Sequence, residues 1–430
     1  MRAAIGSTVV NLFGMALTFL VGILLARALG VEGYGMYGLA MAAVALLAVP
    51  AQLGIPQLLV KEVSASMARH DAASINSIQR WSCRAIGVAT TIVTLLFVLW
   101  IFNRDPKDSA AQNSLLVAAA LIPLTSLLAL QVASLRGMLK ITQGQIPDTL
   151  VRPIVTSLLL WAAHVTAFVM TPALALAAGV MAIGAAIATA QFLRSFTAPE
   201  WLRTRTRAPV ETRAWLSTAV PMAFAESMRV FQGQAAIIAL GLLSTVAMTG
   251  QFRVAASISA LLMFPASIAS LVAAPALSGL FAVGDNTKIQ RLLAYCSAGV
   301  AALSLLLLLP FFLVGDSLIG MAFGEDFQPA NRMLCILGVG VLGNATLGLG
   351  GTLLSMAGKQ KYVALVTLAS TALLCVALVP LIYFFEALGA ALAVTLSTIA
   401  GSSLFWVGAK QTLGFDTSVA SILHALRRNR

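Results

Sequence analysis

The chain has 430 residues, of which 60% are hydrophobic and only 10% are charged. Soluble domains carry roughly 25% charged residues, so the composition excludes a soluble globular protein and predicts that most of the surface faces lipid. The formal net charge of +12 would also suit a nucleic-acid-binding protein, and the positions of the basic residues decide between the two.

Apolar runs long enough to cross a membrane recur along the whole chain. A hydrocarbon core roughly 30 Å thick needs about 20 apolar residues per helix. Twelve such runs occur, near residues 4–29, 36–60, 82–102, 114–136, 148–170, 173–196, 214–243, 251–281, 291–315, 331–356, 361–384 and 387–409. The sequence therefore predicts an all-α polytopic membrane protein with about twelve transmembrane helices.

Lysine and arginine residues are distributed unevenly between the two sets of predicted loops. Twenty of the 27 fall on the side of the chain ends, whereas the opposite side carries four: Arg27, Arg104, Lys107 and Arg332. Because basic loops remain in the cytoplasm, we expect both termini to be cytoplasmic. The positive charge then faces anionic membrane lipids, and no nucleic-acid partner is expected.

The longest strongly charged connection, residues 197–213, lies near the middle of the chain. We interpret it as a cytoplasmic linker between an N-lobe of six helices (1–196) and a C-lobe of six helices (214–412). A shift of 215 residues superposes Gly-x-Tyr-x-x-Ala at 35–40 on Gly-x-Phe-x-x-Ala at 250–255. Such a match indicates two halves related by a parallel repeat about an axis along the membrane normal.

The last predicted segment is residues 413–430. Its apolar residues at helical spacing are Val419, Ile422, Leu423 and Leu426, and they precede an Arg-rich end. This pattern favours a short amphipathic helix on the cytoplasmic leaflet, and a frayed tail is the alternative.

Residues 25–37 carry a resemblance to a known family. They read LARALGVEGYGMY and resemble the first-helix signature of bacterial polysaccharide flippases, in which LAR-LG is followed by YG-x-Y. Residues 233–255 are similar to the seventh and eighth helices of the same family. The resemblance implies the polysaccharide-transport branch of the multidrug/oligosaccharidyl-lipid/polysaccharide (MOP) exporter superfamily. It also implies a V-shaped pair of six-helix lobes around a cavity.

The predicted helix 214–243 contains the strongest candidate site. Glu226, Arg229, Gln232 and Gln234 interrupt an otherwise apolar run, and the first three recur every three residues and share a face. Charges at membrane depth are expensive and mark functional sites by default. We expect the face to line a substrate cavity, where Arg229 meets a pyrophosphate or a sugar acid and Glu226 carries a coupling proton or holds the arginine. The alternative is a structural ion pair.

Other polar residues are weaker candidates. Arg27 and Arg253 lie near the periplasmic ends of their predicted helices; the family resemblance implies pyrophosphate binding by cavity arginines, and snorkelling to the headgroups explains them equally well. Asp148 and Arg152 form an i,i+4 pair at the expected cytoplasmic start of helix 148–170, which favours a structural role. His164 is either a proton carrier or a packing residue. The uncharged candidates for binding sugar hydroxyls are Asn11, Gln52, Gln131 and Gln191.

The sequence contains no catalytic set, no metal-ligand cluster and no phosphate-binding glycine loop with a lysine. We therefore expect a secondary transporter without cofactors, driven by an H⁺ or Na⁺ gradient, the membrane potential or removal of product. The resemblance implies a flippase for undecaprenyl-pyrophosphate-linked oligosaccharide, the repeat unit of O-antigen, capsule or exopolysaccharide, with a polysaccharide polymerase as a candidate partner.

Two other functions remain open. A multidrug exporter of the same superfamily is expected to have acidic cavity residues without arginines. A membrane-embedded polysaccharide polymerase or glycosyltransferase is expected to have a large extramembrane loop with catalytic residues.

Overall fold

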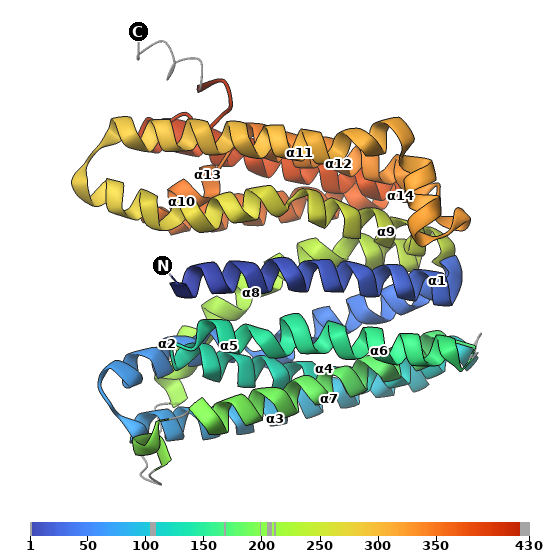
Figure 1. Cartoon of the computed structure of the whole chain (residues 1–430), viewed down its shortest axis with the longest axis horizontal. Helices are drawn as coiled ribbons and strands as arrows, with labels where there is room; N and C mark the ends of the chain where they lie inside the picture. The colour runs from blue at the N-terminus through green and yellow to red at the C-terminus, as the bar shows by residue number, and fades with distance from the viewer. Residues whose placement is uncertain are drawn as a thin grey trace. The chain divides into compact units, whose positions relative to one another are not determined.

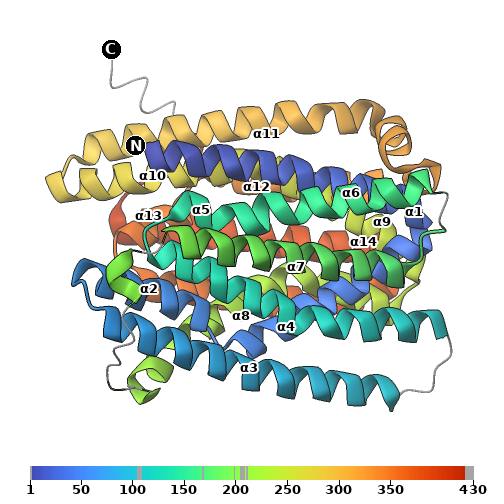
Figure 2. The same cartoon turned by 60° about the horizontal axis from the view of Figure 1, so that its bottom comes forward.

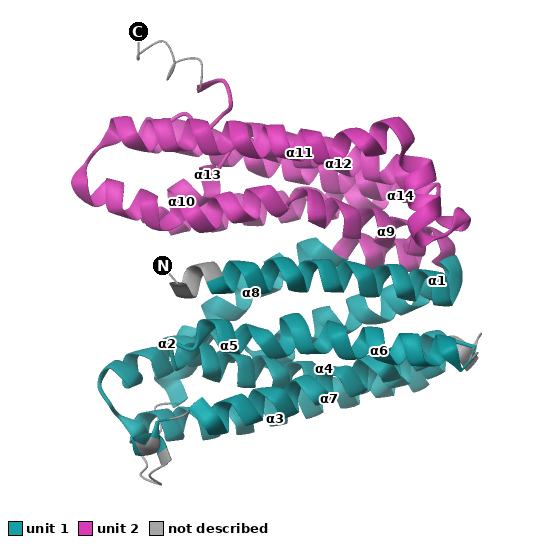
Figure 3. Cartoon of the chain, in the orientation of Figure 1, with its two compact units in different colours: residues 1–234 teal, residues 235–430 magenta. Residues whose placement is uncertain are grey.

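The computed structural model describes residues 2–103, 109–166, 169–197, 199–203, 209 and 212–421, and these ranges are all-helical with connecting turns. Contacts within the chain divide it into two compact units, Met1–Gln234 and Ala235–Arg430 (Figure 3). The predicted linker 197–213 is only partly described, since residues 198, 204–208, 210 and 211 lie outside the described residues. The division into two six-helix lobes therefore stays a prediction.

Unit 1 is a helical bundle arranged around one central helix. Its elements are α1 (Arg2–Gln52), α2 (Ile55–Ala68), α3 (Ala72–Phe102), α4 (Ser109–Gly137), α5 (Ile141–Ile146), the π-helical turn η1 (Pro147–Val151), α6 (Arg152–Val165), α7 (Pro172–Thr197), the 3₁₀ turn η2 (Glu200–Arg203) and most of α8 (Thr212–Leu243). Helix α4 packs against α1, α2, α3 and α7. Figures 1 and 2 show α3, α4 and α7 running alongside one another.

Unit 2 begins near the end of α8 and is also a bundle. Its further elements are α9 (Val246–Leu262), α10 (Phe264–Val283), α11 (Asn286–Phe323), the 3₁₀ turn η3 (Glu325–Phe327), α12 (Ala330–Leu347), α13 (Gly350–Met356) and α14 (Gln360–Leu413). Helix α12 is central and packs against α9, α11 and α14. In Figure 1, α10, α11, α12 and α14 run alongside one another.

Two of the longest helices each contain two of the predicted segments. Helix α1 changes direction at Gly30 (φ 67°, ψ −179°) and α14 at Glu386 (φ 51°, ψ −127°). The reversal in α14 is tight, because a Cβ on Gly389 would lie 1.9 Å from the carbonyl oxygen of Leu381. Glycine at 389 is therefore required by the close approach of the two arms of the helix.

Nine described helices or runs of joined helices are long and apolar enough to cross a membrane. Since α1 and α14 hold two predicted segments each, these nine account for eleven of the twelve. The twelfth segment is α8. Its charged and glutamine residues lower its mean hydropathy, and it is not among the nine.

The start of the fifth predicted segment is corrected by the structure. The sequence placed it at 148–170, but the continuous run of α5, η1 and α6 covers Ile141–Val165. The first turns contain Thr142, Gln143 and Gln145, which concealed the helix from a hydropathy argument. Of these side chains, Gln145 is bonded inside unit 1, where the Ser7 hydroxyl donates a 2.8 Å hydrogen bond to its Oε1.

Two turns, 214 residues apart, have the same local structure. His70 (φ 53°) precedes Asp71 at the start of α3, and Gly284 (φ 75°) precedes Asp285 at the start of α11. Each aspartate is the N-cap of its helix and accepts a 3.0 Å hydrogen bond from the backbone N–H three residues later. Their separation is one residue less than the shift in the sequence, which supports an internal repeat.

The segment that follows α14 is docked onto unit 2. Residues 414–420 are not helical, and the rest of the predicted amphipathic helix, 422–430, lies outside the described residues. Thr417 is fully buried; its hydroxyl donates to Leu347 O at 2.7 Å, and Val419 N–H donates to Thr346 O at 2.9 Å. These bonds satisfy the carbonyl groups at the end of α12, which explains why the segment leaves the helical conformation.

Candidate functional site

The first half of α8 is anchored to unit 1. Its Ala219 is buried in a core cluster with residues of α2 and α3, and Trp215 packs on Trp81 with ring centroids 5.1 Å apart. Gly54, in the break between α1 and α2, has φ 68°, and a Cβ there would lie 2.3 Å from the carbonyl oxygen of Ala219. The break between α1 and α2 lies inside the second predicted segment, 36–60. It contacts α8 just before the polar residues of that helix and holds α8 in place.

Glu226 and Arg229 form a two-point ion pair on α8. Arg229 Nε donates to Glu226 Oε2 at 3.1 Å, and its Nη2 donates to Glu226 Oε1. The arginine side chain nevertheless remains 72% exposed and the glutamate 29%. A guanidinium facing hydrocarbon costs on the order of 3 kcal/mol, so this face of α8 is suited to water or a polar ligand rather than to lipid tails.

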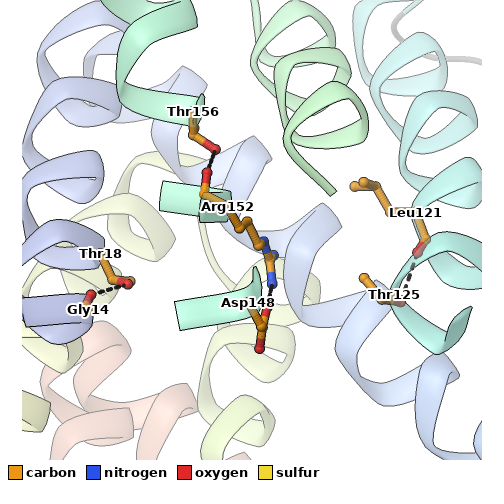
Figure 4. Close-up of polar contacts among 7 residues, drawn as sticks. All are labelled: Gly14, Thr18, Leu121, Thr125, Asp148, Arg152 and Thr156. Carbon is orange, nitrogen blue, oxygen red and sulfur yellow. Dashed lines mark hydrogen bonds and ion pairs between the residues drawn. The ribbon is translucent and has the colours of Figure 1, made fainter. Parts of the chain in front are cut away.

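A second ion pair occupies the π-helical turn of unit 1. Arg152 Nη1 donates to Asp148 Oδ1 at 3.2 Å, and Figure 4 shows the pair between Gly14–Thr18 of α1 and Leu121–Thr125 of α4. Arg152 lies 11 residues into a 25-residue span, about 17 Å from its start at 1.5 Å per residue. The sequence analysis placed this pair at the membrane surface; the earlier start of α5 moves it to the middle of the span.

The π-turn has a local cause. Pro147 and Pro153 lack an N–H group, and between them the Arg152 N–H donates to the Pro147 carbonyl, five residues earlier. Helix α1 approaches this turn closely, because a Cβ on Gly14 would lie 2.0 Å from Thr149 Cγ2 and 2.6 Å from its carbonyl oxygen. Single π-turns are frequent at functional sites.

The remaining predicted residues are distributed over several helices. Arg27 is exposed on α1 three residues before the change of direction, Arg253 is half-buried on α9, and both have interaction partners. Gln232 and Gln234 are half-buried on α8, and Gln232 also has a partner. The exposed candidates are Asn11 on α1, His164 at the end of α6 and Gln191 on α7, and the half-buried ones are Gln52 on α1 and Gln131 on α4.

A buried polar network was missed by the sequence analysis. Arg194 donates to Gln79 Oε1, and Gln79 Nε2 donates to Ser134 Oγ at 2.9 Å. Gln79 is 9% exposed. Hydropathy placed it in a loop, because α3 begins ten residues before the predicted segment. In the part of the chain that the structure describes, no three His, Cys, Asp or Glu side chains are grouped to hold a metal ion.

Comparisons with known proteins give a family and a fold. The model of a family described as "Polysaccharide biosynthesis protein" matches residues 1–281. A search of curated protein sequences finds no match.

Solved structures match over almost the whole chain. A multidrug resistance MATE family transporter of the MOP superfamily, in an inward-facing conformation, has a TM-score of 0.73 at 12% identity and covers 96% of this chain and 98% of its own. A MATE structure in the straight conformation has a TM-score of 0.63 at 13% identity, with 96% and 95% covered. A MOP superfamily transporter from Pyrococcus furiosus has a TM-score of 0.61 at 11% identity, with 96% of each chain covered. At these identities the likeness concerns the fold, which is that of a multi-pass integral membrane protein.

Proposed function

Because the chain belongs to the polysaccharide biosynthesis protein family and has a MOP-type transporter fold, we propose that it is a flippase for a lipid-linked oligosaccharide. Its substrate is an undecaprenyl-pyrophosphate-linked repeat unit of O-antigen, capsule or exopolysaccharide. It carries this substrate from the cytoplasmic to the periplasmic leaflet of the bacterial inner membrane, as a secondary transporter with both termini in the cytoplasm.

The observation that carries this proposal is the hydrogen bonding of two arginines of unit 1, Arg152 and Arg229. A guanidinium has five N–H donors. Arg229 uses two of them on Glu226 and Arg152 uses one on Asp148, and each carboxylate belongs to the same helix as its arginine. The carboxylates hold the guanidinium groups in place, while the other donors make no hydrogen bond to the residues that the structure describes. Arginine donors of this kind suit a pyrophosphate, which accepts paired, charge-assisted hydrogen bonds.

The second candidate is a multidrug exporter, which the likeness to MATE structures favours. For the Pyrococcus furiosus transporter, a binding pocket of reverse polarity suggests a different function, so pocket charge is the relevant criterion within this fold. Cationic drugs need carboxylates that are not neutralised. Here Glu226 and Asp148 are each paired with an arginine, which favours an anionic substrate. Glu226 remains a candidate carrier for a coupling proton.

A deletion strain tests the proposal. Without the flippase, complete lipid-linked repeat units should accumulate on the cytoplasmic leaflet while surface polysaccharide is lost, and the wild-type gene should reverse both effects. Accumulation of incomplete repeat units would identify a transferase instead. Normal surface polysaccharide together with drug sensitivity would favour the multidrug exporter.

A further inference from the structure

Unit 2 contains a cavity of about 250 Å³. Its walls are formed by α10, α11, α12, α13 and α14. The polar side chains that line it are Ser267, Ser270, Ser297, Asn344, Thr352 and Ser402, and no charged residue contributes to the lining. The sequence analysis selected none of these residues.

Two breaks in the helices open onto this cavity. Met263 separates α9 from α10, and Gly348 and Leu349 separate α12 from α13. Gly348 has φ 81°, and a Cβ there would lie 1.9 Å from Thr417 O and 2.3 Å from Ser297 Oγ. Interrupted backbone at membrane depth is tolerated where it is buried in protein or lines a cavity, and in transporters such interruptions form substrate sites. The breaks therefore mark this cavity as a built site.

The hydrogen bonds among the lining residues leave polar atoms without a partner. Ser402 Oγ donates to Asn344 Oδ1 at 2.7 Å, and Thr352 Oγ1 donates to Ser270 Oγ at 3.2 Å. With the amide in this orientation, the Asn344 nitrogen and the Ser270 hydroxyl hydrogen have no acceptor within the described part of the chain. Ser402 Oγ also donates to Thr398 O at 2.9 Å, and if the amide is rotated by 180° its nitrogen donates to Ser402 Oγ instead. In either orientation, one polar end of the Asn344 amide has no partner among the described residues.

The lining chemistry selects a class of ligand. Transfer of an ion into an uncharged cavity is strongly unfavourable unless a counter-charge is present. Neutral hydroxyl and amide groups, with the ring of Phe405 on one wall, are complementary to the hydroxyls and the apolar face of a pyranose ring. Drug-sized ligands occupy pockets of about 300–1,000 Å³, so a cavity of about 250 Å³ suits one monosaccharide.

We propose that this cavity of unit 2 binds one uncharged sugar residue of the oligosaccharide, at a site distinct from the arginines of unit 1. The origin of the sugar in a lipid-linked oligosaccharide rests on the proposed flippase function. The binding itself does not, since it depends only on the lining of unit 2. The two proposals are therefore separable by experiment.

Binding of free sugars to the full chain tests the site. The protein is reconstituted in phospholipid nanodiscs, free of sugar-based detergent, and titrated with N-acetylglucosamine and with glucose by saturation-transfer NMR. We expect weak, saturable binding of at least one sugar, and at least tenfold weaker binding for Asn344→Ala. Ser270→Ala, which removes one hydroxyl, should weaken it less. The matched control is Asn331→Ala, on the same helix but outside the cavity, which should bind like the wild type.

Several outcomes would overturn the proposal. The first is that the folded wild-type protein shows no saturable binding of either sugar. The second is that the Asn344→Ala and Asn331→Ala proteins bind the sugars equally well. A third is thermal stabilisation by Na⁺ that Asn344→Ala abolishes without any sugar binding, which would identify a cation site. If sugar binding depends on Asn344 but the deletion strain keeps its surface polysaccharide, the site stands and the flippase function fails.

Discussion

Substitution of Arg229 separates substrate binding from a structural ion pair. The pair with Glu226 is largely solvent-accessible, since Arg229 is 72% exposed. Exposed ion pairs contribute about 0–1 kcal/mol to stability, so Arg229→Ala should leave the level of folded protein almost unchanged. A hydrogen bond to a charged group contributes roughly 1.5–3 kcal/mol, which corresponds to about 10- to 150-fold in substrate affinity. Transport should therefore fall far more than stability.

The assay compares surface polysaccharide with the amount of folded protein for Arg229→Ala, Arg229→Lys, Glu226→Gln and the double variant Glu226→Gln/Arg229→Gln. Arg229→Lys should retain partial transport because it keeps the charge. The matched control is Lys288→Ala, which breaks an i,i+3 ion pair of nearly the same exposure (70% and 27%) at the start of α11. Normal transport by the double variant would refute a role of Arg229 in substrate binding. The arginine would then serve only to neutralise the charge of Glu226.

Three further predictions concern packing, pH and topology. Gly14→Ala should destabilise the protein by about 1–3 kcal/mol and lower transport, because the new Cβ would overlap Thr149 in the π-turn. Thermal unfolding checks this against Gly87→Ala, where nothing lies within 4 Å of the new Cβ. Equal unfolding temperatures for the two variants would contradict the prediction. Hydrogen bonds from Ser74 lower the pKa of Asp71 below its ordinary 3.8, so this cap stabilises the folded state above that pH and its contribution is lost as the pH falls through the lower, folded-state value. The stability difference between the wild type and Asp71→Ala, about 1 kcal/mol at neutral pH, should shrink below about pH 4, and a difference that does not depend on pH would contradict the assignment. Reporter fusions at Lys359 should read cytoplasmic and at Glu325 periplasmic, and the same side for both would refute the predicted orientation.

Hydropathy located the helices of this chain well, because every predicted segment coincides with a described helix or helical run. It failed where a helix begins with polar residues. Thr142 and Gln145 hid the first turns of the fifth run, so the sequence placed Asp148 and Arg152 at the start of the helix although they lie in the middle of the helical run. Thr142 and Gln145 are half-buried in unit 1, and Gln145 is bonded to Ser7 of α1. A one-dimensional profile contains no information about such tertiary contacts.

The two ion pairs were predictable because their members are three and four residues apart on one helix. The cavity of unit 2 was not. Its polar residues are four serines, one threonine and one asparagine on five helices, from Ser267 to Ser402, and each alone is unremarkable in an apolar run. The left-handed Gly348 and the two helix breaks, at Met263 and between α12 and α13, distinguish the place, and these are properties of the folded backbone.

The docking of residues 415–419 has a practical meaning for protein engineering. Thr417 O accepts a hydrogen bond from the Ser297 hydroxyl at 2.7 Å and lies against Gly348. The non-helical segment after α14 therefore supports two residues that line the cavity. A purification tag or a fluorescent protein joined after Ser421 leaves these bonds in place. A truncation before Asp416 removes them, exposes the carbonyl groups at the end of α12, and should loosen unit 2 although it deletes no membrane-spanning residue.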